Sequence, residues 1–215
     1  MATLANIRDW VRQQTLVEAA DFSAANLTTV INQGLYELGT AGDWPFLDAS
    51  AALIIEDGAD AYALPTGFDR LVAVYDDDGV MLPETHRRSA VQQFRAPVPG
   101  KPQAFYLWQE QLVFVPAPDT TFFMTVDYRK LPTLLVNDTD VPEWHPAFHM
   151  VLAEYAASKV WEREEDMERA GFHYGNFLGK VNDMELFYRN RGMDSPLVVG
   201  FAQKFNDRPW SWQRN

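Results

Sequence analysis

The chain has 215 residues and a formal net charge of −12, with 30 Asp and Glu against 18 Lys and Arg. Its 47% apolar and 22% charged residues are ordinary for a folded protein and exclude global disorder. The absence of Cys excludes disulfides, thiolate metal sites and cysteine nucleophiles. The acidic balance also argues against wrapping of DNA, which needs clustered Lys and Arg. Aromatic residues make up 13% of the chain, an excess that must lie in a core or on a contact surface.

The first residues, Met1 to Trp10, are already amphipathic and lack the apolar core of a signal peptide. The longest apolar runs, such as 51–55, are far shorter than a membrane span. We therefore expect a soluble, non-secreted chain that makes no contact with membranes, and the lack of Cys fits a reducing cytosol.

Residues 1–47 are predicted to form two helices. Leu4, Ile7, Trp10 and Val11 share one face of the first. Ser23 can cap the second, which ends at glycines 39 and 42 before the bulky Trp44-Pro45-Phe46-Leu47 turn. The second helix carries a continuous apolar stripe made of Leu27, Val30, Ile31, Leu35 and Leu38.

Between residues 48 and 131 the apolar period falls towards two, which indicates β-strands. Asp57-Gly58 predicts a hairpin between 53–55 and 61–64, and the acidic turn 76–79 ends the strand 68–75. Further strands are predicted at 104–108, 112–115 and 122–128, with a short helix within 84–94. Short strands separated by turns favour a small antiparallel sandwich or barrel.

Helical periodicity returns after a Pro-bounded connector. One stripe consists of Phe148, Val151, Leu152, Tyr155 and Ala156, and a second of Tyr174, Phe177, Leu178, Val181 and Met184. Gly171, Gly175 and Gly179, four residues apart, predict either close helix packing or a bend.

The expected fold class is α+β, with a helical bundle built from both terminal regions and an inserted small antiparallel β-sandwich or barrel domain. The expected bounds are 1–47 and 140–190 for the bundle, 48–131 for the β domain, 132–139 for a connector and 191–215 for an irregular, extended C-terminal tail.

His145 and His149 have the spacing with which one helical turn can present two metal ligands. The zinc-enzyme motif needs a Glu directly after the first His, and Pro146 stands there instead. We interpret the pair as helix-start or surface residues. The 76–79 segment lacks the alternating ligands and final Glu of a calcium loop, so we interpret it as a turn.

Acidic residues gather between 162 and 168, where they could supply paired catalytic carboxylates or form a solvated helix face. Arg163 and Arg169 offer local partners, which favours the solvated face. The chain has no nucleophile elbow and no Gly-rich phosphate loop. We therefore predict no enzyme, and no catalytic, cofactor-binding or metal site.

The tail from Arg191 onward differs from the rest of the chain. It has no period, and its four basic and two acidic residues give it a net charge of +2, which leaves −14 on residues 1–190. Trp and Arg are the residue types that dominate protein interfaces. The tail could fold back on its own bundle, but we favour contact with a neighbouring chain or another partner. The predicted contact residues are Phe201, Phe205, Arg208, Trp210 and Trp212.

The order of several segments resembles a known family. These segments are Leu27 to Leu35 leading to Trp44-Pro45-Phe46-Leu47, then 62–65 with 68–71, 112–119, 128–132 and 141–146. Over most of residues 10–190 the chain resembles the head-to-tail adaptor, or connector, proteins of tailed bacteriophages, related to the tail tubular protein A group.

The resemblance implies a helical bundle with an inserted β domain, assembled as a dodecameric ring beneath the portal protein in the neck of the virion. Such a ring extends the DNA channel and docks tail or neck proteins, without catalysis or a cofactor. It implies assembly in the bacterial host cytoplasm, and the C-terminal part would grip the portal. An acidic channel wall would let DNA pass without specific binding.

Two functions of other classes are alternatives. The first is a non-catalytic binding module that recognises a carbohydrate or peptide through an aromatic β surface made of Tyr62, Tyr106, Trp108 and Tyr128. Exposed rings on one face would support it. The second is a hydrolase, which would need two carboxylates converging in a concave pocket.

Overall fold

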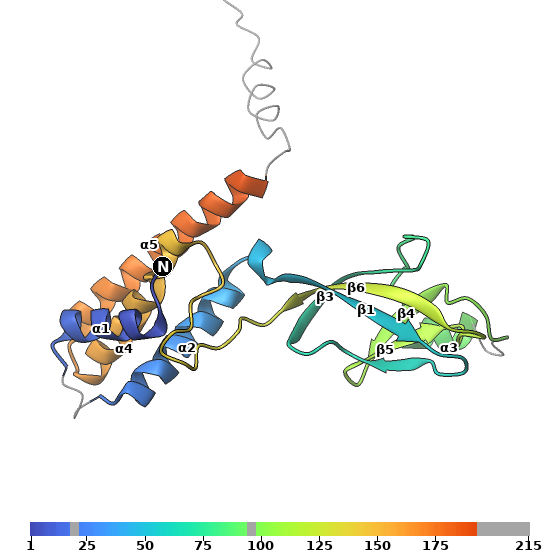
Figure 1. Cartoon of the computed structure of the whole chain (residues 1–215), viewed down its shortest axis with the longest axis horizontal. Coiled ribbons are helices and arrows are strands. Elements are labelled where there is room, and N and C mark those ends of the chain that lie inside the picture. The colour runs from blue at the N-terminus through green and yellow to red at the C-terminus, as the bar shows by residue number, and fades with distance from the viewer. Residues whose placement is uncertain (18–21, 94–97, 193–215) are drawn as a thin grey trace, which may run out of the picture. The chain divides into compact units, whose positions relative to one another are not determined.

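The computed structural model describes residues 1–17, 22–93 and 98–192. This part of the chain contains five α-helices and six strands, so it has the mixed helix and strand content expected from the sequence. The chain divides into two compact units (Figure 1). Unit 1 is formed by Met1–Trp44 and the chain from Leu135 onward, and unit 2 by Pro45–Leu134.

Unit 1 contains α1 (Leu4–Thr15), α2 (Ala24–Ala41), α4 (Val151–Arg163) and α5 (Met167–Gly192). The cap predicted for α2 is confirmed, because the Ser23 side chain accepts a hydrogen bond from the Asn26 N–H. Thr3 and Asn6 form a capping box that starts α1.

Helix α4 lies at the centre of unit 1, and α1, α2 and α5 all pack on it. The sequence predicts one apolar stripe on this helix, but nearly every side chain of residues 151–160 is buried. Ala153, Ala156 and Ala157 are fully buried, and small side chains of this kind let neighbouring helices approach closely. Gly34 of α2 lies directly against the Tyr155 ring of α4.

The chain at residues 135–140 holds the start of α1. The carbonyls of Asp138 and Asp140 accept hydrogen bonds from the Ala5 and Leu4 N–H groups, which have no partner within the helix. The Asn32 side chain of α2 bonds to both the N–H and the carbonyl of Leu135. These residues, expected as a connector, therefore anchor two helices of unit 1.

Unit 2 contains β1 (Asp48–Ile55), β2 (Ala61–Ala63), β3 (Phe68–Tyr75), the short α3 (Arg87–Gln93), β4 (Ala104–Trp108), β5 (Gln111–Val115) and β6 (Phe122–Lys130). The strands form two antiparallel three-stranded sheets, ordered β1-β6-β3 and β2-β5-β4, and the described residues contain no closed barrel. Both sheets contribute to one hydrophobic cluster that includes Val74, Phe105, Phe114, Met124 and Val126.

The hairpin predicted between β1 and β2 is wrong. Gly58 does turn the chain with a positive φ of 73°, but β1 pairs with β6 and β2 pairs with β5. Tyr62 closes this turn, because its hydroxyl bonds to the backbone of Glu56 and Ala59. The turn therefore passes the chain from one sheet to the other.

Candidate interaction surfaces

The contact residues predicted in the C-terminal tail, Phe201, Phe205, Arg208, Trp210 and Trp212, lie outside the described residues. The candidate surfaces considered next lie on the helices of unit 1 and on one sheet of unit 2.

Helix α5 buries only part of its predicted apolar stripe. Phe177, Val181 and Met184 are buried against the unit, whereas Tyr174 and Leu178 are exposed at the surface. The Tyr174 hydroxyl donates a 2.7 Å hydrogen bond to the Glu37 carboxylate of α2, which raises the pKa of Tyr174. Burial raises the pKa of Tyr155 to about 12, and the same carboxylate adds to this effect.

The three glycines, predicted either to allow close helix packing or to mark a bend, lie on the exposed side of α5. A Cβ atom added at Gly171, Gly175 or Gly179 would meet no described atom within 4 Å. The glycines therefore make no close helix contact within the described part of the chain. Beside them, Phe172 is 65% exposed and Leu178 is 50% exposed.

A shallow groove of about 300 Å³ runs between α4 and α5 next to this exposed side. It is lined by Ser158, Lys159, Glu162, Met167, Ala170, Gly171 and Tyr174. An ion pair of 2.7 Å between Lys159 and Glu162 crosses its wall. The remaining acidic side chains of residues 162–168 are largely exposed, and Asp166 caps α5 by accepting from the Arg169 N–H.

A buried ionic cluster joins α4 to α5 beneath these surfaces. Glu154 of α4 is only 5% exposed and accepts a 2.6 Å hydrogen bond from Lys180, while its second oxygen lies 2.8 Å from Nδ1 of His173. Burial by itself would raise the pKa of Glu154, but the hydrogen bonds from Lys180 and His173 outweigh it and lower the pKa. The carboxylate is therefore held in its charged form inside the helical unit.

Sequence patterns did not identify this cluster. Glu154 lies within an apolar run and has the spacing of a residue on the helix surface. His173 and Lys180 come from a different helix, so no local motif connects the three residues. The one available signal was a charged residue inside a stretch that otherwise predicts burial.

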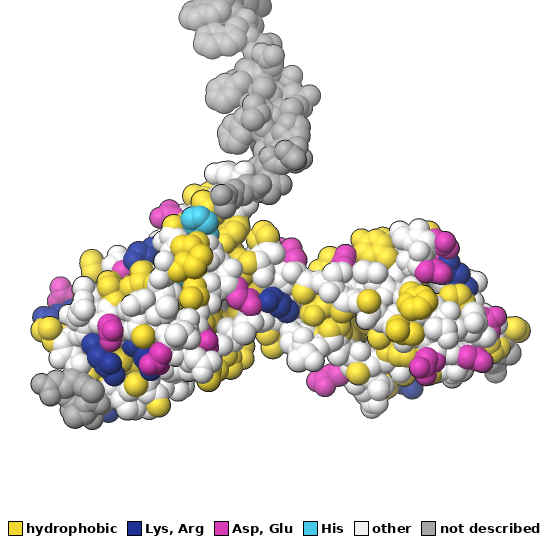
Figure 2. All heavy atoms as spheres, viewed as in Figure 1, with side chains coloured by type: hydrophobic (Ala, Val, Ile, Leu, Met, Phe, Trp, Pro, Cys, Tyr) yellow, Lys and Arg dark blue, Asp and Glu magenta, His cyan; other side chains and the backbone are white. Residues whose placement is uncertain are grey.

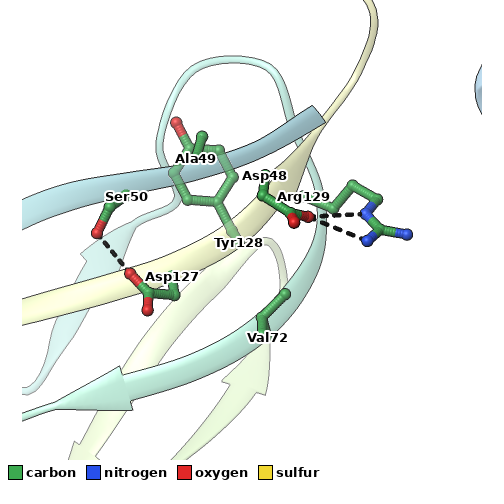
Figure 3. Close-up of a pocket in the computed structure, with 7 residues that line it drawn as sticks. All are labelled: Asp48, Ala49, Ser50, Val72, Asp127, Tyr128 and Arg129. Carbon is green, nitrogen blue, oxygen red and sulfur yellow. Dashed lines mark hydrogen bonds and ion pairs between the residues drawn. The ribbon is translucent and has the colours of Figure 1, made fainter. Parts of the chain in front are cut away.

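In unit 2 the outer face of the β1-β6-β3 sheet is uncovered within the described residues. Ile54 and Phe123, which lie opposite each other in the sheet, are 54% and 60% exposed, and Val72 of β3 is also exposed. A shallow groove of about 410 Å³ crosses the same sheet (Figure 3). It is lined by Asp48, Ala49, Ser50, Val72, Asp127, Tyr128 and Arg129.

Two cross-strand pairs cross this groove in Figure 3. Ser50 bonds to Asp127, and the Arg129 guanidinium donates to Asp48 at 3.0 Å. The carboxylates already have partners on the adjacent strand, so the groove is a polar hollow beside an apolar surface. Side chains coloured as hydrophobic reach the surface of both units in Figure 2.

A family model described as SU10 adaptor protein matches residues 2–200, nearly the whole chain. The chain belongs to the SU10 adaptor protein family. Membership identifies it as a phage adaptor, a structural component of the virion that contacts other parts of the capsid or tail. The match supports the adaptor family, and it does not confirm the narrower relation to the tail tubular protein A group. No curated protein matches the chain.

The aromatic β surface of the alternative binding function is not favoured in this adaptor. Tyr128 is buried and stacks on Phe68, and Tyr62 packs edge-on against the core residue Phe114. Trp108 is 41% exposed, but its ring is covered by the Arg87 guanidinium at 3.9 Å. The four rings thus do not form one exposed face.

The histidines considered as metal ligands have structural partners. Nε2 of His149 lies 3.0 Å from the Trp144 carbonyl, and Nδ1 lies 3.1 Å from both the backbone nitrogen and the carbonyl oxygen of Ala2. Nδ1 of His145 accepts from the Ala147 N–H and caps the short 3₁₀ helix Pro146–Phe148. His149 thereby fixes the N-terminus of the adaptor against the chain before α4.

The predicted turn at residues 76–79 is confirmed. Gly79 has a φ of 77°, and Asp76 accepts hydrogen bonds from the Asp78 and Val80 N–H groups. The Lys101 ammonium lies within 3.2 Å of all three neighbouring carboxylates, those of Asp76, Asp77 and Asp78. Lys101 therefore supplies the positive charge that this acidic turn requires, and it lowers the pKa of Asp76 against the opposing effect of burial.

None of the helices within the described ranges combines the length and apolar character that a membrane span requires.

Proposed function

We propose that this adaptor forms a ring beneath the portal protein, extends the DNA channel and docks tail or neck proteins. The observation that carries the proposal is the family match over residues 2–200, which identifies a phage adaptor. In this proposal twelve copies form the ring in the neck of the virion after synthesis in the bacterial host cytoplasm. The terminal helices act as a bundle and the strands as an inserted sandwich-like domain.

The charge of the chain suits a channel for DNA. A net charge of −12 on each copy gives a ring a strongly negative potential. A wall of carboxylates repels phosphate, so DNA would move past it without specific binding. The proposal requires neither a cofactor nor a catalytic residue.

The basic aromatic tail is proposed to hold the portal or a neighbouring subunit. The proposed anchors are Phe201, Phe205, Arg208, Trp210 and Trp212, on a segment of net charge +2. Large aromatic side chains and Arg carry much of the binding energy in protein interfaces. A positive segment would also be attracted to an acidic partner surface.

The test is electron microscopy of the purified full chain mixed with the portal protein of the same phage. We expect a ring of the adaptor on one end of the portal. Failure to associate with the portal or any other neck component would contradict the proposal.

The role of the tail is tested separately by deletion of residues 209–215, which removes both tail tryptophans. We expect weaker docking on the portal with an unchanged far-ultraviolet circular dichroism spectrum. Arg214→Gln is the control and should dock nearly as the wild type does, because it removes the one charged side chain that the deletion removes and keeps both tail tryptophans. If the deletion variant docks on the portal as strongly as the wild type does, residues 209–215 do not hold the portal.

A further inference from the structure

One exposed side of α2 carries no charged residue. The side chains that face away from unit 1 belong to Ala25, Thr29, Gln33, Tyr36 and Thr40, which form one stripe along the helix. The single charged residue of α2 is Glu37, and its carboxylate accepts from Tyr174. We call this stripe the α2 face.

The exposed side of α5 between residues 171 and 182 is also free of charged residues. Its members are Gly171, Phe172, Gly175, Leu178, Gly179 and Asn182, which we call the α5 face. The two basic side chains in this stretch, His173 and Lys180, are bound to Glu154, and the Tyr174 hydroxyl is bound to Glu37. Phe172 and Leu178 nevertheless leave large apolar side chains in contact with solvent.

The glycines give the α5 face its shape. None of the three has a positive φ, and no described atom lies where their Cβ atoms would be. Glycine weakens a helix interior, so these positions lower the stability of α5 without any benefit inside the described part of the chain. They leave a notch between Phe172 and Leu178 that no described side chain fills.

Other exposed helical surfaces of unit 1 are charged. Helix α1 exposes Asp9 beside Arg12, and the α4–α5 junction exposes Glu162, Arg163, Glu164 and Glu165. Copies that each carry a net charge of −12 repel one another, and the centres of protein interfaces are depleted of charge. Two acidic copies therefore meet most favourably through faces such as those of α2 and α5.

We propose that the α2 face of one copy packs against the α5 face of the next copy. This inference rests on the proposed function, since it names the surface through which copies of the adaptor meet. The two faces differ, one bearing protruding side chains such as Tyr36 and the other a glycine notch. A contact between two different faces is heterologous, so it repeats from copy to copy and closes into a ring when the rotation allows.

The test uses two variants of the full chain that each block one face, Gln33→Glu on α2 and Leu178→Glu on α5. Each variant alone should associate at least tenfold more weakly than the wild type in analytical ultracentrifugation. An equimolar mixture should form a one-to-one dimer and nothing larger, because each variant keeps the face that the other has lost. Gln13→Glu, the same change at an exposed position of α1, is the matched control and should assemble as the wild type does.

The outcomes separate this inference from the proposed function. Self-association of Gln33→Glu at wild-type strength would show that the α2 face is not used and would overturn the inference. A wild-type chain that stays monomeric both alone and on the portal would also overturn it. Multi-copy binding of the wild type and both variants to the portal would overturn the inference and leave the proposed function intact.

Discussion

Replacement of Gly34 by Ala tests how α2 packs on α4. The added Cβ would lie 2.5 Å from Cδ1, 2.8 Å from Cγ and 3.1 Å from Cβ of Tyr155. The Cβ atom of Tyr155 is held by the α4 backbone and Cγ lies on the axis about which the ring turns, so rotation of the ring relieves neither of these two contacts. The two helices must separate by several tenths of an ångström.

The magnitude follows from two opposing effects. Overpacking of a core costs about 1–3 kcal/mol. Replacing a helix-interior Gly by Ala returns about 1 kcal/mol. The difference is a net loss of about 0–2 kcal/mol of unfolding free energy for Gly34→Ala, with a fall in Tm of up to roughly 8 °C for a chain of this size.

The assay is thermal and urea unfolding followed by circular dichroism, with Gly175→Ala as the matched control. Gly175 also lies in the interior of a helix, but it is exposed and has no neighbour within 4 Å, so the control should gain about 1 kcal/mol. The two Gly→Ala changes are thus expected to have opposite signs. A Gly34→Ala variant that gains as much stability as Gly175→Ala would refute the packing of α2 on Tyr155.

Two further changes, Glu154→Gln and Lys101→Met, test other contacts. Glu154→Gln should lose roughly 2–3 kcal/mol of unfolding free energy, because it leaves His173 and Lys180 without their buried partner. Chemical denaturation at pH 7 measures this loss. An unchanged denaturation midpoint would show that the cluster does not stabilise the fold. Because the pKa of Glu154 is lowered in the folded state, its contribution to folding stability is complete above its ordinary pKa of 4.5. This contribution is lost as the pH falls through the lower pKa of the folded state. The stability of Glu154→Gln should therefore fall less steeply with decreasing pH than that of the wild type. Lys101→Met should speed amide hydrogen exchange at residues 76–80 of the acidic turn, while exchange in α5 stays unchanged. Equal exchange at residues 76–80 in the variant and the wild type would show that the Lys101 ammonium does not hold the turn.

Local sequence patterns predicted the individual strands of this fold better than they predicted which strands pair with each other. Residues 68–75 and 122–128 alternate so regularly that both strands were expected from the sequence, and β6 buries Met124 and Val126 as the pattern requires. The Asp57-Gly58 turn also forms. Its flanking strands nevertheless pair elsewhere, because turn chemistry fixes only the local bend, whereas β6 offers β1 a partner along its whole length.

The sequence of a single helix also does not show whether that helix is buried on several sides. Periodicity assigns α4 a single apolar stripe, but three helices cover it, so Ser158 and Glu154 are buried as well. The Glu154 carboxylate finds its partners, His173 and Lys180, on α5, whereas the Ser158 hydroxyl donates to the Tyr155 carbonyl of its own helix. The exposed side of α5 was missed for the opposite reason, since Tyr174 and Leu178 fit the helical period and yet face outward.

The charge distribution predicts that salt affects the contact between copies and the docking of the tail on the portal in opposite ways. If acidic copies meet through the uncharged α2 and α5 faces, added salt screens their repulsion, and self-association should strengthen as the Debye length falls from about 30 Å at 0.01 M to about 10 Å at 0.1 M. Docking through the basic tail, of net charge +2, on an acidic partner should weaken over the same range. Sedimentation of the adaptor alone and with the portal, at both salt concentrations, measures each response. Self-association that weakens with added salt would show that ion pairs hold the copies together. The uncharged α2 and α5 faces cannot supply such ion pairs, so this result would contradict the proposed contact.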